Sequence, residues 1–342
     1  MSCDSPVFCD NEFEMAMITY KRASFVRRWL SECIEGIKKY NIQLSIYDSS
    51  DNDDTFSVIE QISTEYDYII RYNRLPSNTT GGYKYIPPIL ATTCKYIMIV
   101  GDSRYHVIDD LANNVFPLIK SGRFDAISLS YFNNEQDEMK EYDCFNDYYY
   151  ECFIPLTCCG MTIFKTSVFD AIKCNPNELT RYDMLYKGMF GFAYMGYYLE
   201  AFAKDSNKAI TVKVPWHSIN PQRKIQHWNI KFYECWCDEL CEIMDRLPNT
   251  IQNKDIILKN TWETMKLDGF DDLYLARKAG GLTMIDYRRM VSKGYLQRVT
   301  SRTYRFKLMA TMPLFLITPV YFIFRCIRKG IRLISWKQGE YL

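Results

Sequence analysis

The chain has 342 residues and a net charge of +1, and 48% of its residues are hydrophobic while 24% are charged. These proportions are ordinary for a globular protein, and the length excludes a minimal domain. It suits one large α/β domain with an appendage, or two modest domains. The near-zero net charge argues against wholesale nucleic-acid binding, so no nucleic-acid partner is expected.

Short apolar strands alternate with amphipathic helices in the first part of the chain. Apolar and alternating segments predict strands at residues 14–20, 42–48, 66–72 and 96–100. Helical spacing predicts helices at 24–40, 55–63 and 83–94, the last interrupted at Pro87 and Pro88. Alternation of this kind predicts βαβ units and a mostly parallel sheet.

The pattern continues beyond residue 101 with one interruption. A helix is predicted at 107–121, and strands at 125–132, 158–164 and 209–216. The polar and aromatic residues 133–151 are interpreted as an excursion from the sheet. Residues 226–290 are predicted to be helical. We therefore expect an α/β domain at 1–225, a helical region at 226–298 and a distinct tail at 299–342.

The tail differs from the rest of the chain in charge and hydropathy. Eight basic and no acidic residues occur from Arg302 to Lys337, which leaves a net charge of −7 for the remainder. The 16 residues from Met309 to Phe324 carry no charge but include Pro313 and Pro319. A spanning helix needs about 20 apolar residues. We predict a segment on an anionic membrane surface, peripheral on the inner face of the cell membrane; a spanning helix and a helix packed on the body remain alternatives.

The 13 cysteines are odd in number and scattered, and the opening residues MSCDSPVFCDNEFE are acidic and lack an apolar h-region. This pattern predicts reduced thiols in a cytoplasmic compartment. Cys235, Cys237 and Cys241 suggest zinc, but their spacing falls within an expected helix and no matching pair follows. We interpret them as small core residues.

Residues 96–104, YIMIVGDSR, contain the first functional signal. Five apolar or aromatic residues precede Gly101 and Asp102. In an open α/β sheet, ligands bind outside the carboxyl ends of the strands, so we expect Asp102 to face a ligand. Two earlier segments also join a strand to a polar turn, MAMITYKRASFVRRWLSECI and LSIYDSSDNDDT.

In order and spacing, these three segments resemble the blocks of family 2 glycosyltransferases, and the resemblance covers residues 14–217. It implies a GT-A fold, a nucleotide-sugar-binding, Rossmann-like mixed α/β sheet with helices on both faces. Asp48 would then accept a hydrogen bond from the base, Lys84 would approach the diphosphate, and Asp102 would lie at the diphosphate and its metal. The implied nucleotide-sugar site comprises Thr19, Tyr20, Arg22, Asp48, Ser49, Gly82, Lys84, Asp102, Ser103 and Arg104.

The chain departs from the Asp-x-Asp motif of this family, because Arg104 stands where the second carboxylate is expected. In one interpretation Asp102 and His217 still hold Mn²⁺ or Mg²⁺. In another, Arg104 itself neutralises the diphosphate. A third interpretation is a surface ion pair between Arg104 and Asp109.

A second departure concerns the catalytic base. The family places an acidic pair before the last sheet strand, where this chain has Met195 and Gly196. An inverting transferase needs a base near its acceptor. The candidates are Asp183 and Glu200, with His217 as a further one.

The resemblance and the tail together imply an inverting glycosyltransferase. It would move a sugar from a nucleotide-sugar donor, most simply a UDP-sugar, to a lipid-linked oligosaccharide in the synthesis of capsule, exopolysaccharide or another cell-surface polysaccharide. The alternative is a catalytically inactive subunit that binds a nucleotide sugar or a partner transferase. A nucleotidyltransferase is disfavoured, because TYKRASF lacks the glycine-rich loop after the first strand. Whether the chain forms a homo-oligomer is left open.

Overall fold

The computed structural model describes residues 7–77, 79, 82–130, 139–174, 208–215, 217–218, 230–247 and 249–339. The chain forms two compact units. The first comprises residues 1–222 and 246–252, and the second comprises residues 223–245 and 253–342. The short segment 246–252 therefore belongs with the first unit, although the chain on either side of it belongs to the second.

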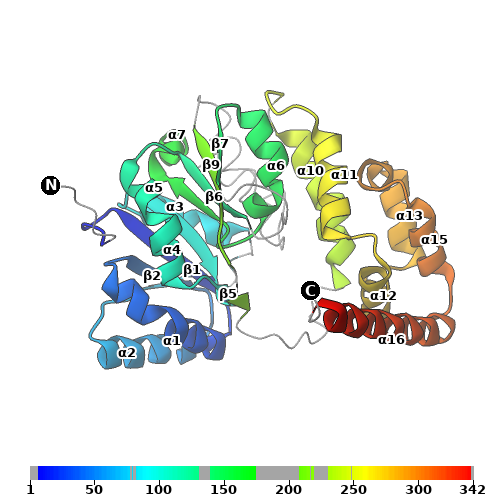
Figure 1. Ribbon diagram of the computed structural model, residues 1–342, viewed down its shortest axis with the longest axis horizontal. Coiled ribbons are helices and arrows are strands. Elements are labelled where there is room, and N and C mark those ends of the chain that lie inside the picture. The colour runs from blue at the N-terminus through cyan, green and yellow to red at the C-terminus, as the bar shows by residue number, and fades with distance from the viewer. Residues whose placement is uncertain are drawn as a thin grey trace. The chain divides into compact units, whose positions relative to one another are not determined.

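The first unit is an α/β unit (Figure 1). Its described elements are β1 (Phe13–Thr19), α1 (Ala23–Lys39), β2 (Gln43–Asp48), α2 (Asp54–Tyr66), β3 (Arg71–Arg74), the 3-10 turn η1 (Tyr83–Tyr85), α3 (Ile86–Ala91), β4 (Tyr96–Gly101), β5 (Arg104–Tyr105), α4 (Ile108–Asn114), α5 (Phe116–Ser121), β6 (Ala126–Ser130), β7 (Met139–Tyr142), α6 (Phe145–Thr157), β8 (Thr162–Lys165), the 3-10 turn η2 (Thr166–Phe169), α7 (Asp170–Lys173), β9 (Ala209–Lys213) and β10 (His217–Ser218).

Among the described residues, eight strands form one sheet in the order β3-β2-β1-β4-β8-β6-β9-β7. Strands β3, β2, β1 and β4 are parallel to one another, whereas β8 runs antiparallel to both β4 and β6. Strand β9 is parallel to β6, and β7 is an antiparallel edge strand on β9. A separate two-stranded ribbon joins β5 to β10. The predicted fold class, a mixed α/β sheet with a helical C-terminal region, is confirmed.

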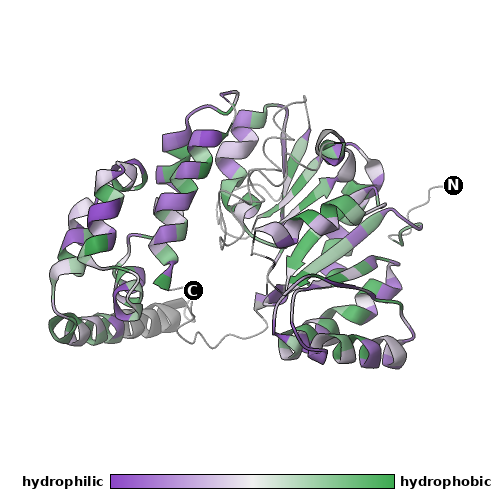
Figure 2. Cartoon of the chain, turned by 180° about the vertical axis from the view of Figure 1, so that it is seen from behind, coloured by the Kyte–Doolittle hydropathy of each residue, from purple (hydrophilic) through white to green (hydrophobic). Residues whose placement is uncertain are grey.

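The central strands are hydrophobic along their whole length because both faces of the sheet are covered. Every residue of β4 from Tyr96 to Val100 is buried. Helix α1 buries one stripe of side chains, including Leu30, Cys33 and Ile37, and exposes charged residues on its other side (Figure 2). Helices α1 and α2 lie side by side (Figure 1).

The interpretation of residues 133–151 as an excursion from the sheet is wrong for its described part. This part contains β7 and most of α6. Strand β7 is a short edge strand with three exposed residues in four, so it lacks the alternation of a half-buried strand. Helix α6 packs against β6 and β9 through tyrosines that look polar in the sequence. The Tyr148 hydroxyl lies 2.7 Å from Ser128 Oγ, which allows the ring to be buried.

The second unit is helical. Its described elements are a π-helix (Glu234–Glu239), α10 (Leu240–Arg246), α11 (Lys254–Met265), α12 (Phe270–Ala279), α13 (Met284–Ser292), α14 (Tyr295–Val299), α15 (Thr303–Thr311) and α16 (Leu314–Gly339). Aromatic side chains form its centre: Tyr233 contacts both Trp262 and Phe306. Trp262 donates a hydrogen bond from Nε1 to the Trp236 carbonyl at 3.0 Å.

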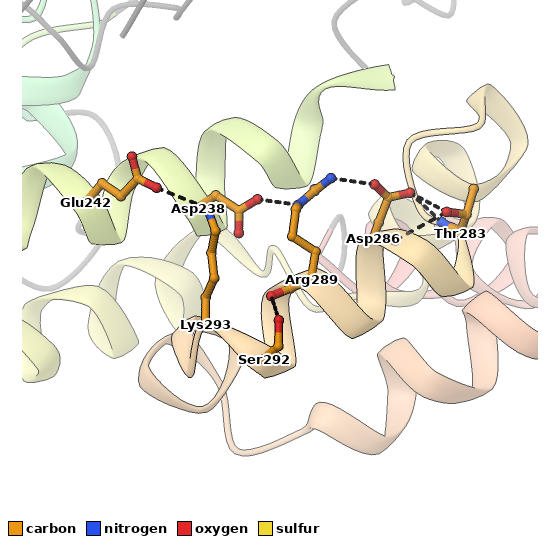
Figure 3. Close-up of polar contacts among 7 residues, drawn as sticks. All are labelled: Asp238, Glu242, Thr283, Asp286, Arg289, Ser292 and Lys293. Carbon is orange, nitrogen blue, oxygen red and sulfur yellow. Dashed lines mark hydrogen bonds and ion pairs between the residues drawn. The ribbon is translucent and has the colours of Figure 1, made fainter. Parts of the chain in front are cut away.

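An ion-pair network joins α13 to the π-helix and α10 (Figure 3). Arg289 donates from Nε to the buried Asp238 at 2.7 Å and from a terminal nitrogen to Asp286 at 2.9 Å. Asp286 also completes a capping box with Thr283 at the start of α13. Burial raises the pKa of Asp238, and Arg289 opposes that shift. Arg289 therefore provides the direct ion pair that compensates for burial of this carboxylate, and the charge of Lys293 acts in the same direction.

The tail forms α15 and α16, which are interrupted at Met312 and Pro313. Tyr321 of α16 stacks on Tyr274 of α12, with ring centroids 3.8 Å apart. One side of α16 is thus packed on its own unit. Within the residues that the structure describes, no helix has both the length and the apolar composition needed to cross a membrane.

Candidate functional site

Three polar residues meet where neighbouring parallel strands end. In the sheet register, Thr19 of β1 lies opposite Asp48 of β2, and Ile18 lies opposite Gly101 of β4. Asp102 directly follows Gly101, so it adjoins Thr19 on the side away from Asp48. The structure therefore brings the two carboxylates to either side of Thr19 at the carboxyl edge of the sheet, where open α/β sheets bind ligands.

Asp102 is the centre of this cluster and is only 4% exposed. Thr19 Oγ1 donates to one carboxylate oxygen at 2.7 Å, and Arg22 pairs with the other at 2.8 Å. The Arg22 guanidinium also lies over the Phe25 ring, 3.9 Å from its centroid, which fixes its plane. Burial raises the pKa of Asp102, while Arg22, Thr19 and Lys84 act in the opposite direction.

Lys84 is brought to the same cluster by the turn η1. Gly82 begins this turn, and the Tyr85 hydroxyl lies 2.8 Å from Cys159 Sγ beside Gly101. Lys84 Nζ is 4.6 Å from the centroid of the Tyr20 ring. Burial lowers the pKa of Lys84, and the charges of Asp48 and Asp102 oppose that shift. The lysine is therefore partly desolvated and close to both carboxylates.

Asp48 is fully buried and supports the turn that follows β2. Its Oδ1 accepts hydrogen bonds from Ser50 N at 2.9 Å and from Ser50 Oγ, and its Oδ2 accepts one from Tyr72 at 3.2 Å. The Ser50 hydroxyl in turn accepts from the backbone of Lys21 at 2.7 Å. The buried Ser49 hydroxyl has no hydrogen-bond partner among the described residues. Ser49 therefore retains an unused polar group beside Thr19, whose carbonyl its backbone contacts.

The residues after Asp102 form the two-stranded ribbon. Ser103 and Arg104 are exposed, and the Arg104 carbonyl accepts a hydrogen bond from Trp29 Nε1 at 3.0 Å. Across the ribbon, the exposed His217 lies opposite Tyr105, with ring centroids 5.4 Å apart. The suggested partner of Arg104, Asp109, is held instead by Lys39 at 2.8 Å and Tyr40 at 2.6 Å.

His106 is a structural residue that the sequence analysis did not single out. Its Nδ1 lies 2.7 Å from the Pro215 carbonyl and its Nε2 lies 2.8 Å from the Gly160 carbonyl. These contacts tie the segment after Asp102 to the turn before β8 and to the approach to His217. Burial lowers the pKa of His106, and the contacts with the two carbonyls act in the opposite direction. The available signal was its position four residues after Asp102 in a chain with three histidines.

The residues of this cluster do not fit a divalent ion held by protein ligands. Among the described residues, no group of three or more His, Cys, Asp or Glu side chains is arranged to hold a metal. Each oxygen of Asp102 already has a partner, one of them a cation. Arg104 adds a further cation two residues later. The candidate catalytic residues Asp183 and Glu200 lie outside the described residues.

No protein-family model and no curated protein matches this chain. It is similar to the crystal structure of S. aureus TarS 1-349, with a TM-score of 0.49 and 11% identity over 86% of this chain and 89% of that chain. For TarS 1-349 in complex with UDP-GlcNAc, the TM-score is 0.47 with 12% identity over 85% and 82% of the two chains. For the mannosyltransferase PcManGT from Pyrobaculum calidifontis, in complex with GDP-Man and Mn2+, the TM-score is 0.48, with 14% identity over 92% of this chain and 87% of that chain. Sheet order and strand directions give this chain a mixed α/β fold.

Proposed function

We propose that the protein is an inverting glycosyltransferase that uses a nucleotide-sugar donor, most simply a UDP-sugar. The observation that supports this most directly is the cluster of Thr19, Arg22, Lys84 and Asp102, which brings together the ends of the adjacent parallel strands β1 and β4 and the turn η1. These are residues that the resemblance to family 2 glycosyltransferases assigned to the donor site, and they come from segments far apart in the chain. A purely structural ion pair would not require a partly desolvated lysine beside it.

The reaction breaks the bond between the sugar's anomeric carbon and the diphosphate, and the bonding electron pair leaves with the diphosphate oxygen. The acceptor hydroxyl oxygen forms the new bond, and its proton passes to a base. Arg22 and Lys84 would stabilise the negative charge that develops on the diphosphate. Asp102 holds Arg22 in place. Asp183 and Glu200 remain the proposed bases, with His217 as the described candidate on the ribbon.

Nucleotide binding and turnover are tested separately on the full-length chain. Calorimetric titration with UDP, GDP and ADP should show binding, with UDP favoured. Release of UDP from UDP-sugars should then increase when membrane vesicles that contain undecaprenyl-diphosphate-linked sugars are added. Binding without any UDP release would favour the inactive-subunit alternative. A protein that binds none of the three nucleotides would refute the donor site.

The lipid-linked acceptor and the membrane location are proposed from the surface of α16. Its buried side includes Ile317 and Tyr321, whereas a broad opposite face leaves apolar side chains in solvent. Positions spaced by three and four residues form this exposed face, as expected for one side of a helix. We call it the apolar face of α16, and it comprises Phe315, Leu316, Val320, Phe322, Ile323 and Ile327.

Charge identifies the proposed partner of the apolar face. The segment from Arg302 to Lys337 contains eight basic and no acidic residues. A helix with exposed apolar side chains and flanking cations suits the boundary of an anionic bilayer. Binding there would bring the chain to a membrane that carries lipid-linked acceptors, and we propose that cell-surface polysaccharide is extended on its cytoplasmic face.

The membrane proposal is tested by co-sedimentation with phosphatidylcholine vesicles that contain either no anionic lipid or about 30% phosphatidylglycerol. Binding should require the anionic lipid and decrease in high salt. Phe322→Glu should weaken it about tenfold or more, because it adds a charge to the apolar face. Ile285→Glu is the matched control, since Ile285 is 76% exposed on α13 of the same unit. Equal loss in both variants, or none in Phe322→Glu, would contradict the proposal.

A further inference from the structure

The charge balance around Asp102 differs from that of a metal-binding site. A site that binds Mg²⁺ needs at least one carboxylate available to the ion, because Mg²⁺ is bound through one or two carboxylates together with substrate phosphates and water. Here the two carboxylates Asp48 and Asp102 lie among the cations Arg22 and Lys84. Both oxygens of Asp48 accept hydrogen bonds within the protein. The cluster therefore offers no surplus of negative charge to a metal.

Arg22 already pairs with the Asp102 carboxylate, through which a metal ion would have to be bound. Its terminal nitrogen is 2.8 Å from the carboxylate, and the Phe25 ring stacks against its guanidinium. The Arg22 side chain is nevertheless 37% exposed, so its fork has a side open to solvent. A guanidinium has five N–H groups in one plane and can bind a carboxylate on one edge and a phosphate on the other. Arg22 is thus oriented in advance for an anion.

Lys84 provides the second cation at the cluster. Burial disfavours its charged form, and the facing carboxylates only partly compensate for that cost. An incoming diphosphate would supply the missing negative charge. The Tyr20 ring beneath Nζ is 44% exposed and limits where the ammonium can move. Arg22 and Lys84 therefore approach one region from two segments of the chain, one after β1 and one in η1.

We propose that this protein binds the diphosphate of its nucleotide ligand through Arg22 and Lys84, without a divalent metal ion. This inference rests on the proposed function, because it concerns the same donor site. Asp102 serves as the anchor that orients Arg22. The chemical class recognised is a nucleoside diphosphate, with its two phosphates facing the two cations.

Calorimetric titration of the full-length chain with UDP, in EDTA and in Mn²⁺, tests the inference. Affinity should agree within about twofold in the two buffers, and titration with Mn²⁺ alone should show no binding. Arg22→Gln and Lys84→Gln should each weaken UDP binding in EDTA by about tenfold or more. Lys21→Gln is the matched control, because that neighbouring lysine is paired with the exposed Asp51 at 2.9 Å. Its effect should stay below about twofold.

The variants also report on Asp102 itself. Arg22→Gln removes the cation from the buried carboxylate, so Mn²⁺ should improve UDP binding by that variant but not by the wild type. Thermal unfolding of each variant establishes that it is folded. Wild-type binding that requires Mn²⁺ would overturn the inference and leave the proposed function standing. If no nucleotide binds in either buffer, the proposed function itself fails.

Discussion

Replacement of Asp102 by Asn tests whether the buried carboxylate stabilises the fold or opposes it. The carboxylate is 4% exposed and has two charge-assisted partners, Thr19 at 2.7 Å and Arg22 at 2.8 Å. Asn is almost isosteric: its carbonyl can accept from Arg22 while its amide donates to the Thr19 hydroxyl. The substitution therefore removes the charge and leaves the shape of the site.

The expected change in the free energy of unfolding follows from two opposing terms. Each charge-assisted hydrogen bond contributes about 1.5–3 kcal/mol, and solvent screening reduces the contribution of the partly exposed Arg22. Burying the carboxylate costs several kcal/mol. Burial raises the pKa of Asp102 above 3.8 in spite of its partners, so the ionised form opposes folding. This cost is absent below pH 3.8 and is complete once the pH exceeds the native pKa.

At pH 7 we expect Asp102→Asn to be as stable as the wild type or up to about 2 kcal/mol more stable. Urea unfolding measures this difference. Arg22→Gln is the paired variant, and it should be about 1–2 kcal/mol less stable because it leaves Asp102 buried and unpaired. Destabilisation of Asp102→Asn by more than about 1 kcal/mol would refute the reasoning, since the ion pair would then stabilise the fold on balance.

Three further substitutions test the packing and the charges elsewhere. Burial raises the pKa of Glu239 to about 7, so the native state loses stability as the pH rises from 4.5 towards 7. In urea unfolding, the free energy of unfolding of Glu239→Gln should therefore be about 1–2 kcal/mol higher than that of the wild type at pH 8 and equal to it at pH 4. A difference that does not change with pH would contradict this prediction. Gly36→Ala should cost about 1–3 kcal/mol, although alanine favours helices, because overpacking is destabilising. The alanine Cβ would lie 2.6 Å from Ile108 Cβ. A more stable variant would contradict this prediction and show that α4 can move away from α1. Arg289→Met should cost about 2–3 kcal/mol by leaving Asp238 unpaired, and the loss should shrink when Asp238→Asn is added.

Strands could be predicted where burial of their own side chains leaves a recognisable pattern in the sequence. Residues 96–100 are a continuous apolar and aromatic run because β4 is covered on both faces. Residues 42–48 alternate apolar and polar side chains, which is the other pattern that predicts a strand, although β2 is buried along most of its length. The predicted strand at 66–72 began too early, because α2 continues to Tyr66 and ends at Asp67 in a left-handed conformation with φ 47°. Strand β7 depends on pairing with the distant β9, and its exposed side chains leave no periodic signal.

The carboxyl edge of the candidate site could also be predicted, because parallel strands place their ends side by side. Thr19, Asp48 and Asp102 follow from that rule and from the three sequence segments. The cation beside Asp102 could not be predicted in the same way. Lys21 adopts a left-handed conformation with φ 52°, and the following residue, Arg22, pairs with Asp102. Neither fact has a signature in composition or spacing.

The backbone after Asp102 explains how an arginine can stand where a second carboxylate was expected. Trp29 holds the carbonyl of Arg104, and His106 contacts the carbonyls of Gly160 and Pro215. These contacts involve main-chain oxygens or a neighbouring ring, so the position of the loop does not depend on a metal bound by the side chain at residue 104. A carboxylate there would therefore serve the ligand rather than the fold. Its replacement by a cation, beside an Asp102 already paired with Arg22, is the change expected of a site that neutralises phosphate with its own side chains.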